Sequence, residues 1–492
     1  MEALTEAAIS PYDQIRYPSM VHESLHPARL SVFACLHDRP FAPASRCRLL
    51  EIGCGDGMNL MSIAATAPQS QFVGFDLAGT TIATGRAMAA AAGLTNVELS
   101  VMNILNTPAS LGEFDYIVAH GVYAWVTPPV REALMRLIGH MLAPNGLAQI
   151  SYNAMPGCRI RHIVRDILQD CLANVSDTAT RLAAAKEWLD LFAAKWSEAD
   201  PLQNAMRHRV QELLLFPLEV IFHDEMGEIY EPQFVSDVAA DAKRHGLQYL
   251  CDAQPVCGCE ALIPSEERSL LRERVGEDFV RFEQEYDFAT LLPFRSSLLC
   301  RDGGTIDRSA AWTRVHKLHA RGRFVPVSAD ESPPGRFEFR THENGRAATS
   351  ESVIADLLGR IGAAEPHSVS LATQIANQEI AETVLRLFQI GALSLQTEPF
   401  PFALTPGERP VASPLARLQA ANGENNLASL RHAMVEINDA NTRYFISLLD
   451  GTRTRRDLVI EMARFIGAPA EAIATELNET LSRLAHMALL TG

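Results

Sequence analysis

The sequence lacks any long hydrophobic run. Its longest apolar stretch, at 213–222, is shorter than the roughly 18 residues of a membrane span and contains Pro217. The N-terminus is acidic and has no apolar segment of the kind that directs secretion. Both absences favour a soluble protein that stays in the cytoplasm.

Positive charge is also scarce. The chain has 43 Lys and Arg against 59 Asp and Glu, so its net charge is −16 at neutral pH. Because nucleic-acid backbones are bound by basic surfaces, this balance argues against a duplex nucleic-acid partner. A stretch with several cations, 308–323, has the composition of a solvated helix face.

The nine cysteines include no CxxC pair. Their odd number and wide scatter are typical of reduced thiols in a cytoplasm. Cys251, Cys257 and Cys259 lie close together in the sequence, but a zinc site needs further ligands. We therefore expect no metal, and we interpret these residues as small apolar side chains.

At 492 residues, the chain is long enough for two to four domains. Residues 46–153 alternate apolar, strand-like runs with stretches of helical spacing. Such alternation specifies parallel strands joined by crossover helices. The expected strands lie at 46–52, 71–76, 96–103, 114–121 and 146–153.

The stretch 156–225 is mostly helical and is expected to be an insertion within the sheet. Residues 234–253 then follow the order helix, Gly246, strand, so the sheet resumes there. Residues 294–301 are expected to form the final strand, antiparallel and at the edge. The predicted fold class is α/β, with a doubly wound, mostly parallel seven-stranded sheet and a helical insertion.

Beyond about residue 305, proline-rich breaks separate two similar stretches, each ending with a helix and a short apolar tail. We predict two winged-helix-like α+β modules here. They lack a basic recognition helix, so a packing or regulatory role is favoured over DNA binding. The predicted units are a core with an N-terminal lid at 1–155, the insertion and return to the sheet at 156–305, and the two modules at 306–405 and 406–492.

The motif EIGCGDG (51–57) forms a glycine loop directly after the first strand. Glycines let the backbone approach a ligand, and sites for NAD, FAD and S-adenosylmethionine all use such loops. Met58 stands where a dinucleotide fingerprint has its third glycine. Glu51 and Asp56 add negative charge, which suits a sulfonium and an ammonium better than a pyrophosphate.

Polar residues end the next two strands. Asp76 ends the second, where a carboxylate can accept hydrogen bonds from both ribose hydroxyls. Asn103 ends the third, within reach of an adenine edge, although such a residue is often only a helix cap. Parallel strand ends share one edge of the sheet, so a nucleoside site is predicted there. Its residues are Glu51, Gly53, Cys54, Gly55, Asn59, Asp76, Leu77, Asn103 and Ile104.

EIGCGDG, FVGFDLA and FDYIVAHGV resemble the first, second and fourth motifs of class I S-adenosylmethionine-dependent methyltransferases. A closer resemblance is to bacterial methyltransferases that carry a methyltransferase regulatory domain, among them lysine methyltransferases that act on a rickettsial outer-membrane protein. It is dense over about 10–305 and looser beyond. The strings that carry it are YDQIRYPS (12–19), ESLHP (23–27), AHGVYAWV (119–126) and SYNAMPG (151–157).

The resemblance implies S-adenosylmethionine as cofactor and a lid over it that includes Tyr12, Tyr17 and His26. It also suggests a homodimer. Four residues near the expected site depart from the family pattern. Asn103 stands where many relatives have Asp, Ala124 and Ala154 replace residues that are often hydroxylated, and Cys158 stands where an aromatic is common. These departures flank the expected acceptor pocket, so the resemblance indicates the cofactor more directly than it indicates the substrate.

Methyl transfer is an in-line displacement in which the protein aligns donor and acceptor. A lysine acceptor must be neutral, and an apolar aromatic pocket would lower its pKa and hold the methylated product. Tyr123, Trp125 and Tyr152 are candidates for such a pocket, the alternative being core aromatics. His120 is expected to offer its backbone carbonyl to the cofactor ammonium, or otherwise to act as a base.

Three functions follow as hypotheses. The first is N-methylation of lysine side chains on a protein. The second is methylation of a small molecule, with the insertion shaping a pocket. The third is a non-catalytic, cofactor-binding protein that regulates or interacts through its C-terminal modules.

Overall fold

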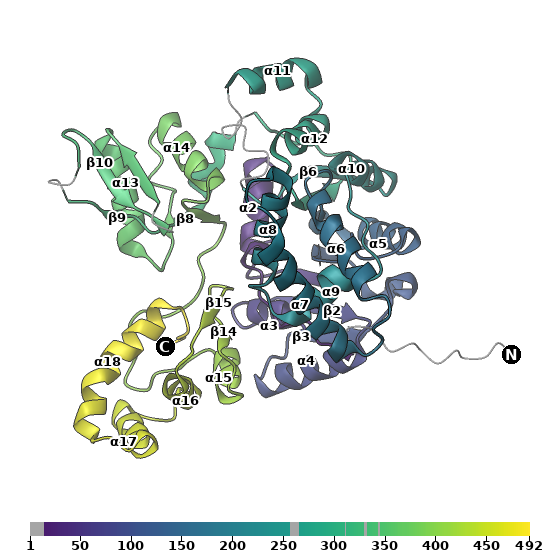
Figure 1. Ribbon diagram of the computed structural model, residues 1–492. Helices are drawn as coiled ribbons and strands as arrows, with labels where there is room; N and C mark the ends of the chain where they lie inside the picture. The colour runs from purple at the N-terminus through teal and green to yellow at the C-terminus, as the bar shows by residue number, and fades with distance from the viewer. Residues whose placement is uncertain (1–13, 256–264, 310, 329–331, 343–344) are drawn as a thin grey trace.

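The computed structural model describes residues 14–255, 265–309, 311–328, 332–342 and 345–492 (Figure 1). A seven-stranded sheet lies within residues 48–301. The strand order is β3-β2-β1-β4-β5-β7-β6. Only β7 runs antiparallel to its neighbours. The strands are β1 (Arg48–Ile52), β2 (Gln71–Asp76), β3 (Val97–Val101), β4 (Phe114–Ala119), β5 (Leu142–Asn153), β6 (Leu247–Asp252) and β7 (Phe294–Arg301).

The seven predicted strands all form. Gly246, with φ +73°, links α10 (Val235–Arg244) to β6, as the sequence pattern indicated. The antiparallel direction of β7 is confirmed, but its predicted place at the edge is wrong, because it lies between β5 and β6. Six of its eight residues are buried, as befits an inner strand covered on both faces.

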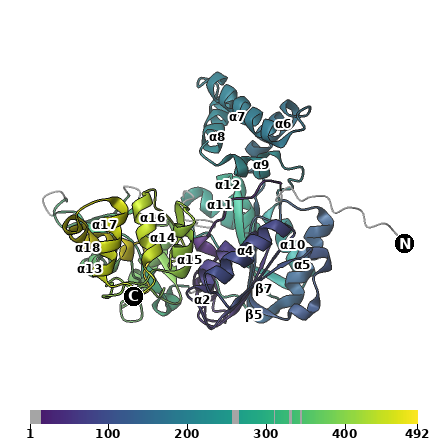
Figure 2. The same cartoon turned by 90° about the horizontal axis from the view of Figure 1, so that it is seen from below.

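Helices cover both faces of the sheet (Figure 2). One face packs against α2, α3 and α4 through residues such as Leu30, Leu60 and Ile82. The other packs against α5 and α10 through Leu134 and Val238. The bounds of these helices are α2 (Pro27–Leu36), α3 (Met58–Ala64), α4 (Gly79–Ala91) and α5 (Pro128–Met141).

The predicted helical insertion is confirmed and stands out from the sheet as a separate lobe (Figure 2). It has its own apolar core around Leu168, Leu189 and Val210. Among the residues described, no helix combines the length and the apolarity needed to cross a membrane. The lobe consists of α6 (Arg159–Cys171), α7 (Thr178–Lys195), α8 (Pro201–Leu213) and α9 (Leu218–Met226); α11 (Ser265–Val275) and α12 (Phe279–Thr290) follow later, before β7.

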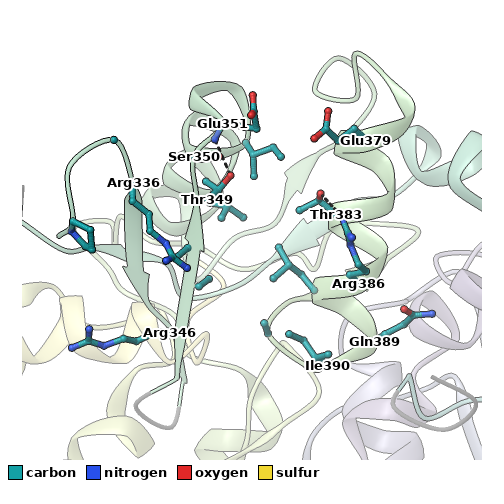
Figure 3. A pocket seen from close by; sticks show the side chains of 18 of the residues that line it. Arg336, Arg346, Thr349, Ser350, Glu351, Glu379, Thr383, Arg386, Gln389 and Ile390 are labelled. Atoms are coloured by element: carbon teal, nitrogen blue, oxygen red, sulfur yellow. Dashed lines mark hydrogen bonds between the residues drawn. The ribbon is translucent and has the colours of Figure 1, made fainter. Parts of the chain in front are cut away.

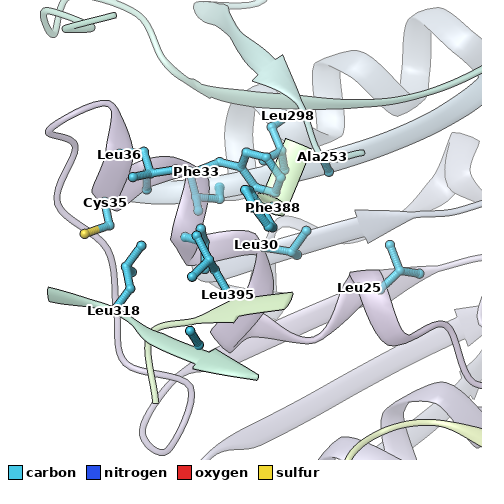
Figure 4. Packing of buried hydrophobic residues seen from close by; sticks show 14 of the residues in the cluster. Leu25, Leu30, Phe33, Cys35, Leu36, Ala253, Leu298, Leu318, Phe388 and Leu395 are labelled. Atoms are coloured by element: carbon cyan, nitrogen blue, oxygen red, sulfur yellow. The ribbon is translucent and has the colours of Figure 1, made fainter. Parts of the chain in front are cut away.

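Helix α2 lies between the sheet and the first C-terminal module. Phe33 contacts Phe388, with ring centroids 5.9 Å apart, within one continuous apolar cluster (Figure 4). The backbone N–H of Thr397 also donates to the carbonyl of Ala28 over 2.9 Å. The module contains η5 (Ala311–Lys317), β8 (His319–Arg321), β9 (Val325–Pro326), β10 (Phe337–Arg340), β11 (Arg346–Thr349), α13 (Ser352–Ala364), β12 (Val369–Ser370), α14 (Gln378–Gln389) and β13 (Ser394–Gln396).

The second C-terminal module is a compact helical unit with its own core around Phe445, Leu458 and Leu484. A capping box between Thr454 and Asp457 begins α17, because each side chain accepts a backbone N–H of the other. The elements are α15 (Pro414–Ala421), β14 (Asn426–Ala428), β15 (Met434–Glu436), α16 (Ala440–Leu448), α17 (Arg455–Ile466) and α18 (Ala470–His486).

Candidate cofactor-binding site

The glycine loop after β1 turns through a left-handed backbone. Gly53, Gly55 and Gly57 have φ values of +72°, +56° and +75°. A Cβ atom at Gly53 would lie 2.7 Å from Val122, whereas one at Gly55 would meet no atom within 4 Å. The loop is therefore tightly packed at its start and open at Gly55, where a ligand can approach the backbone.

Glu51, at the end of β1, has a buried carboxylate with one unsatisfied oxygen. Asn59 Nδ2 donates to Oε1 over 3.0 Å, while Oε2 has no hydrogen-bond partner among the described residues. The pKa of Glu51 is raised to about 8, mainly by burial and also by the carboxylates of Asp56 and Asp76, while the hydrogen bond from Asn59 opposes the rise. Since a buried polar atom without a partner is costly, this oxygen is suited to bind an external donor.

Asp76 is oriented by two backbone donors at the end of β2. The N–H of Gly55 donates to Oδ2 over 3.0 Å and that of Ala78 donates to Oδ1 over 2.9 Å. The carboxylate therefore faces the open part of the glycine loop. Cys54, between these glycines, is buried, and burial raises the pKa of its thiol well above the usual range.

Apolar side chains are exposed beside Asp76. Leu77 is 60% exposed, Val101 53% and Leu105 50%, and Val101 pairs with Asp76 in the β2–β3 register. Exposed aliphatic groups at strand ends suit the faces of a planar purine ring. Leu105 was missed at the sequence level, because exposure of an apolar residue cannot be seen in the pattern.

Asn103 caps the short helix η2 (Ile104–Asn106). Its Oδ1 accepts the N–H of Leu105 over 2.9 Å, which is the alternative role that the sequence left open. Ile104 is half-buried against the apolar face of the sheet. Contact of either side chain with an adenine stays a prediction.

Residues 14–26, here called the N-terminal segment, lie across the glycine loop. Arg16 and Ser19 both donate to the carboxylate of Asp56. The backbone N–H of His22 donates to Asn59 Oδ1 over 3.1 Å. The motif YDQIRYPS indicated this segment, but Arg16, Ser19 and His22 were not predicted, since no local pattern shows which residues meet a distant loop.

The three predicted lid residues have different places. Tyr12 lies outside the described residues. Tyr17 lies beside His223 of α9, with ring centroids 5.7 Å apart. His26 is buried and begins α2, because its Nδ1 accepts the N–H of Ala28 over 3.1 Å. The N-terminal segment thus lies beside the glycine loop, while its role as a lid and the cofactor roles of these residues stay predictions.

His120 directly follows β4 and faces the N-terminal segment. Its ring centroid lies 4.1 Å from that of His22 and 6.1 Å from that of Phe294. The pKa of His120 is lowered to about 3, mainly by burial and also by the nearby His22. The imidazole is therefore neutral and a weak base. Next to it, the N–H of Gly121 donates to Ser151 Oγ over 2.8 Å, which joins the ends of β4 and β5.

Tyr123 and Tyr152 lie in the core. Both are almost fully buried, and their ring centroids are 6.0 Å apart. The hydroxyl of Tyr123 donates to Asp241, and that of Tyr152 shares a hydrogen bond of 2.9 Å with Ser297. These positions match the core alternative of the sequence analysis rather than the walls of an open pocket.

Trp125 is half-buried at the junction with the insertion. Its ring lies 5.0 Å from that of Tyr230, centroid to centroid. The guanidinium groups of Arg161 and Arg165 lie 5.2 and 5.5 Å from its ring centroid. These arginines already make the cation–π contacts that a methylated lysine would need.

Among the described residues, Glu132, Asp241 and His245 can bring one ligand atom each within 4.8 Å of the others. Arg244 donates to Asp241 over 2.7 Å, so a cation already balances this group. Of the predicted cysteine cluster, Cys251 is buried in the sheet, and Cys257 and Cys259 lie outside the described residues. The group of Glu132, Asp241 and His245 lies on α5 and at the C-terminal end of α10, and it shares no residue with the glycine loop.

An open hollow of about 890 Å³ lies in the first C-terminal module (Figure 3). Arg336 and Arg346 line it from the β10–β11 hairpin, and Glu379 and Arg386 from α14. It includes no residue of the glycine loop or of the strand ends, so it is separate from the candidate site.

Comparison with known proteins identifies the family of the domain that contains the glycine loop. A family model of a methyltransferase domain matches residues 49–146, and one of a predicted methyltransferase regulatory domain matches 217–301. An uncharacterised protein of Rickettsia prowazekii (strain Madrid E) is 31% identical over 229 residues, which are 46% of this chain and 92% of that protein. The chain belongs to the S-adenosylmethionine-dependent methyltransferases with a regulatory domain.

The similarity extends beyond the catalytic unit of this methyltransferase. A model described as "PKMT, C-terminal winged helix domain" matches residues 408–470. A second R. prowazekii protein is 29% identical over 65% of this chain, and the match spans 58% of that protein's length. PKMT2 from Rickettsia typhi has the same fold, with a TM-score of 0.84 and 24% identity over 97% of this chain and all of that one. Its complex with AdoHcy gives a TM-score of 0.85. The match at 408–470 confirms a winged helix in the second C-terminal module.

Proposed function

We propose that this methyltransferase transfers a methyl group from S-adenosylmethionine to lysine side chains of a protein. The observation that supports S-adenosylmethionine as the cofactor is the unsatisfied oxygen of Glu51, together with the open backbone at Gly55. A protein lysine as acceptor is supported by the resemblance to lysine methyltransferases and by the winged-helix match. A neighbour of the same fold, PKMT2, has been solved with AdoHcy.

The residues at the strand ends offer one partner for each part of the cofactor. Glu51 suits the ammonium group, and Asp76 suits the ribose hydroxyls, since each carboxylate oxygen can accept more than one hydrogen bond. Leu77 and Leu105 suit the faces of the adenine. The backbone carbonyl of His120 is a further partner for the ammonium. When bound, the cofactor supplies an electrophilic methyl group on its sulfonium.

The acceptor amine must lose its proton before attack. His120 is too weak a base to remove it, because burial holds its pKa near 3. The rings of His22, His120 and Phe294 instead form a buried, uncharged cluster, and desolvation of an amine beside uncharged groups lowers its pKa. The protein thus favours the neutral amine by its surroundings and orients it toward the methyl group.

A transfer assay with radiolabelled S-adenosylmethionine and a cell lysate tests the proposal. We expect label in a protein band, recovered as methyllysine after hydrolysis. At a cofactor concentration below saturation, a Glu51→Gln variant should transfer much less label, and Glu98→Gln, at an exposed position of β3, serves as the matched control. Label only in small molecules would replace the proposal with a small-molecule methyltransferase. Tight cofactor binding without any transfer would indicate a regulatory protein.

A further inference from the structure

The second C-terminal module contacts the N-terminal segment directly beside the glycine loop. Val21 lies in one apolar cluster with Met58 and Met61 of α3 and with Leu415 and Ala428 of the winged-helix module. Figure 1 shows α15 and the β14–β15 hairpin beside α3 and α4. The segment that covers the loop is therefore enclosed between the methyltransferase sheet and the far end of the chain.

His432 belongs to the same contact. It lies in the turn between β14 and β15 and is almost fully buried. Its φ of +58° is a left-handed conformation that costs a histidine energy and that glycine would adopt freely. A strained residue kept at a domain contact points to a role for its side chain.

The ring of His432 joins two elements of the candidate site. Its Nδ1 shares a hydrogen bond of 3.0 Å with Ser62 Oγ on α3. Its ring centroid lies 5.4 Å from that of His26, at the end of the N-terminal segment. Burial lowers the pKa of His26 to about 3 and that of His432 far below its usual value, so both rings are neutral.

Helix α3 connects this contact to the cofactor edge. Ser62 lies three positions after Asn59, so both side chains lie on the same side of the helix. Asn59 accepts the backbone N–H of His22 and donates to Glu51. One face of α3 therefore holds the winged-helix module, the N-terminal segment and the carboxylate with the unsatisfied oxygen.

We propose that His432 is a positioning residue for the cofactor site: from the winged-helix module it holds the N-terminal segment closed over the glycine loop. This inference rests on the proposed function, because it assigns a role toward the same cofactor. His432 does not touch the glycine loop itself and acts through Ser62 and His26. The apparent affinity for the cofactor then depends on the fraction of molecules in which the segment is closed.

Two substitutions separate the effect of the His432 side chain from the effect of its strained backbone. His432→Gly removes the side chain and adopts the left-handed turn without strain. His432→Asn tolerates the same turn and keeps a polar atom close to the position of Nδ1. His486→Ala, at an exposed histidine in α18 of the same module, is the matched control. The measurements are calorimetric affinity for S-adenosylhomocysteine and hydrogen–deuterium exchange of residues 14–26 without cofactor.

We expect His432→Gly to weaken binding about tenfold, as when the closed fraction falls to about one in ten. Exchange in residues 14–26 should rise in parallel, and His432→Asn should restore part of both. Wild-type affinity and exchange in His432→Gly would overturn the inference. Should this variant not fold, Ser62→Ala gives the same test from the other partner, with a smaller change in the same direction. If the wild type binds no cofactor, the proposed function fails, whereas the exchange comparison still tests the inference.

Discussion

Two buried carboxylate clusters lie at the same edge of the sheet, and they differ in whether their atoms are satisfied. At the start of β7, Arg295 is fully buried and donates to Glu283, Asp287, Asp252 and the hydroxyl of Tyr249. No fully buried side-chain polar atom of this group lacks a partner in the described chain. At the end of β1, one oxygen of Glu51 has none.

The pKa values follow the same difference. Burial raises the pKa of Asp252 and of Asp287 to about 6, because Arg295 opposes the effect of burial. Burial raises that of Glu51 to about 8, where only the Asn59 bond opposes it. Buried charge by itself therefore does not identify a ligand site. The Arg295 cluster satisfies its own buried charges, whereas one oxygen of Glu51 is left without a partner, which the proposed function assigns to the ammonium of the cofactor.

The largest effect is expected at Arg295. Arg295→Met leaves three carboxylates buried without their cation, so the free energy of unfolding should fall by about 3–5 kcal/mol. Urea denaturation followed by circular dichroism measures this loss. Arg281→Met removes an exposed ion pair with Glu285 and should change stability by less than about 1 kcal/mol. Equal losses of stability in both variants would show that the buried Arg295 cluster contributes no more than an exposed ion pair.

Asp76 and Glu51 should show the opposite pattern. Asp76→Ala should weaken cofactor binding by more than about tenfold, the equivalent of about 1.4 kcal/mol. Glu51→Gln, which is nearly isosteric, should weaken it similarly while leaving stability unchanged or raised, because a buried ionisable group is removed. Calorimetry and thermal melting on the same samples measure both quantities. Unchanged affinity in Asp76→Ala would refute its ribose contact.

Cofactor binding should release a proton from Glu51. In the free protein its pKa is raised to about 8, so the carboxyl group is mostly protonated at pH 7, and an ammonium favours the ionised form. Affinity should therefore increase as the pH rises toward about 8, and Glu51→Gln should lose this dependence. Calorimetry in two buffers with different ionisation enthalpies detects the proton. Without cofactor, the same raised pKa makes stability fall as the pH rises from about 4.5 to about 8.

The smallest effect is expected at Tyr123. Tyr123→Phe removes the hydrogen bond to Asp241 and should lower stability by about 1 kcal/mol, with no change in cofactor affinity. Chemical denaturation and calorimetry check the two halves of this prediction. If stability were unchanged and the rate of methyl transfer reduced, the result would instead support Tyr123 as a residue of the acceptor pocket.

The sequence predicted the parts of the molecule whose cause is local. Alternating apolar runs and glycine turns gave all seven strands, and EIGCGDG with Asp76 indicated the edge at which the site lies. The position of β7 was wrong, because a strand's pattern shows that it is buried but not which strands lie beside it. Tyr123 and Tyr152 were ambiguous for a similar reason, since an aromatic residue after a strand suits a core and a pocket equally.

Contacts between distant segments could not be predicted. Arg16 and Ser19 meet Asp56, and His432 meets Ser62, only after the chain has folded. No local spacing encodes such pairs. The left-handed φ of His432 could not be predicted either, because glycine or asparagine usually occupies such a position in a turn.

The hydrogen bond between Ser62 and His432 spans 370 positions of the chain. During synthesis, the glycine loop, Asp76 and all of the sheet leave the ribosome long before the turn that contains His432. A nascent or truncated chain can therefore complete its sheet while the N-terminal segment still lacks its outer support. The module that encloses the N-terminal segment is therefore synthesised only after the sheet that this segment covers.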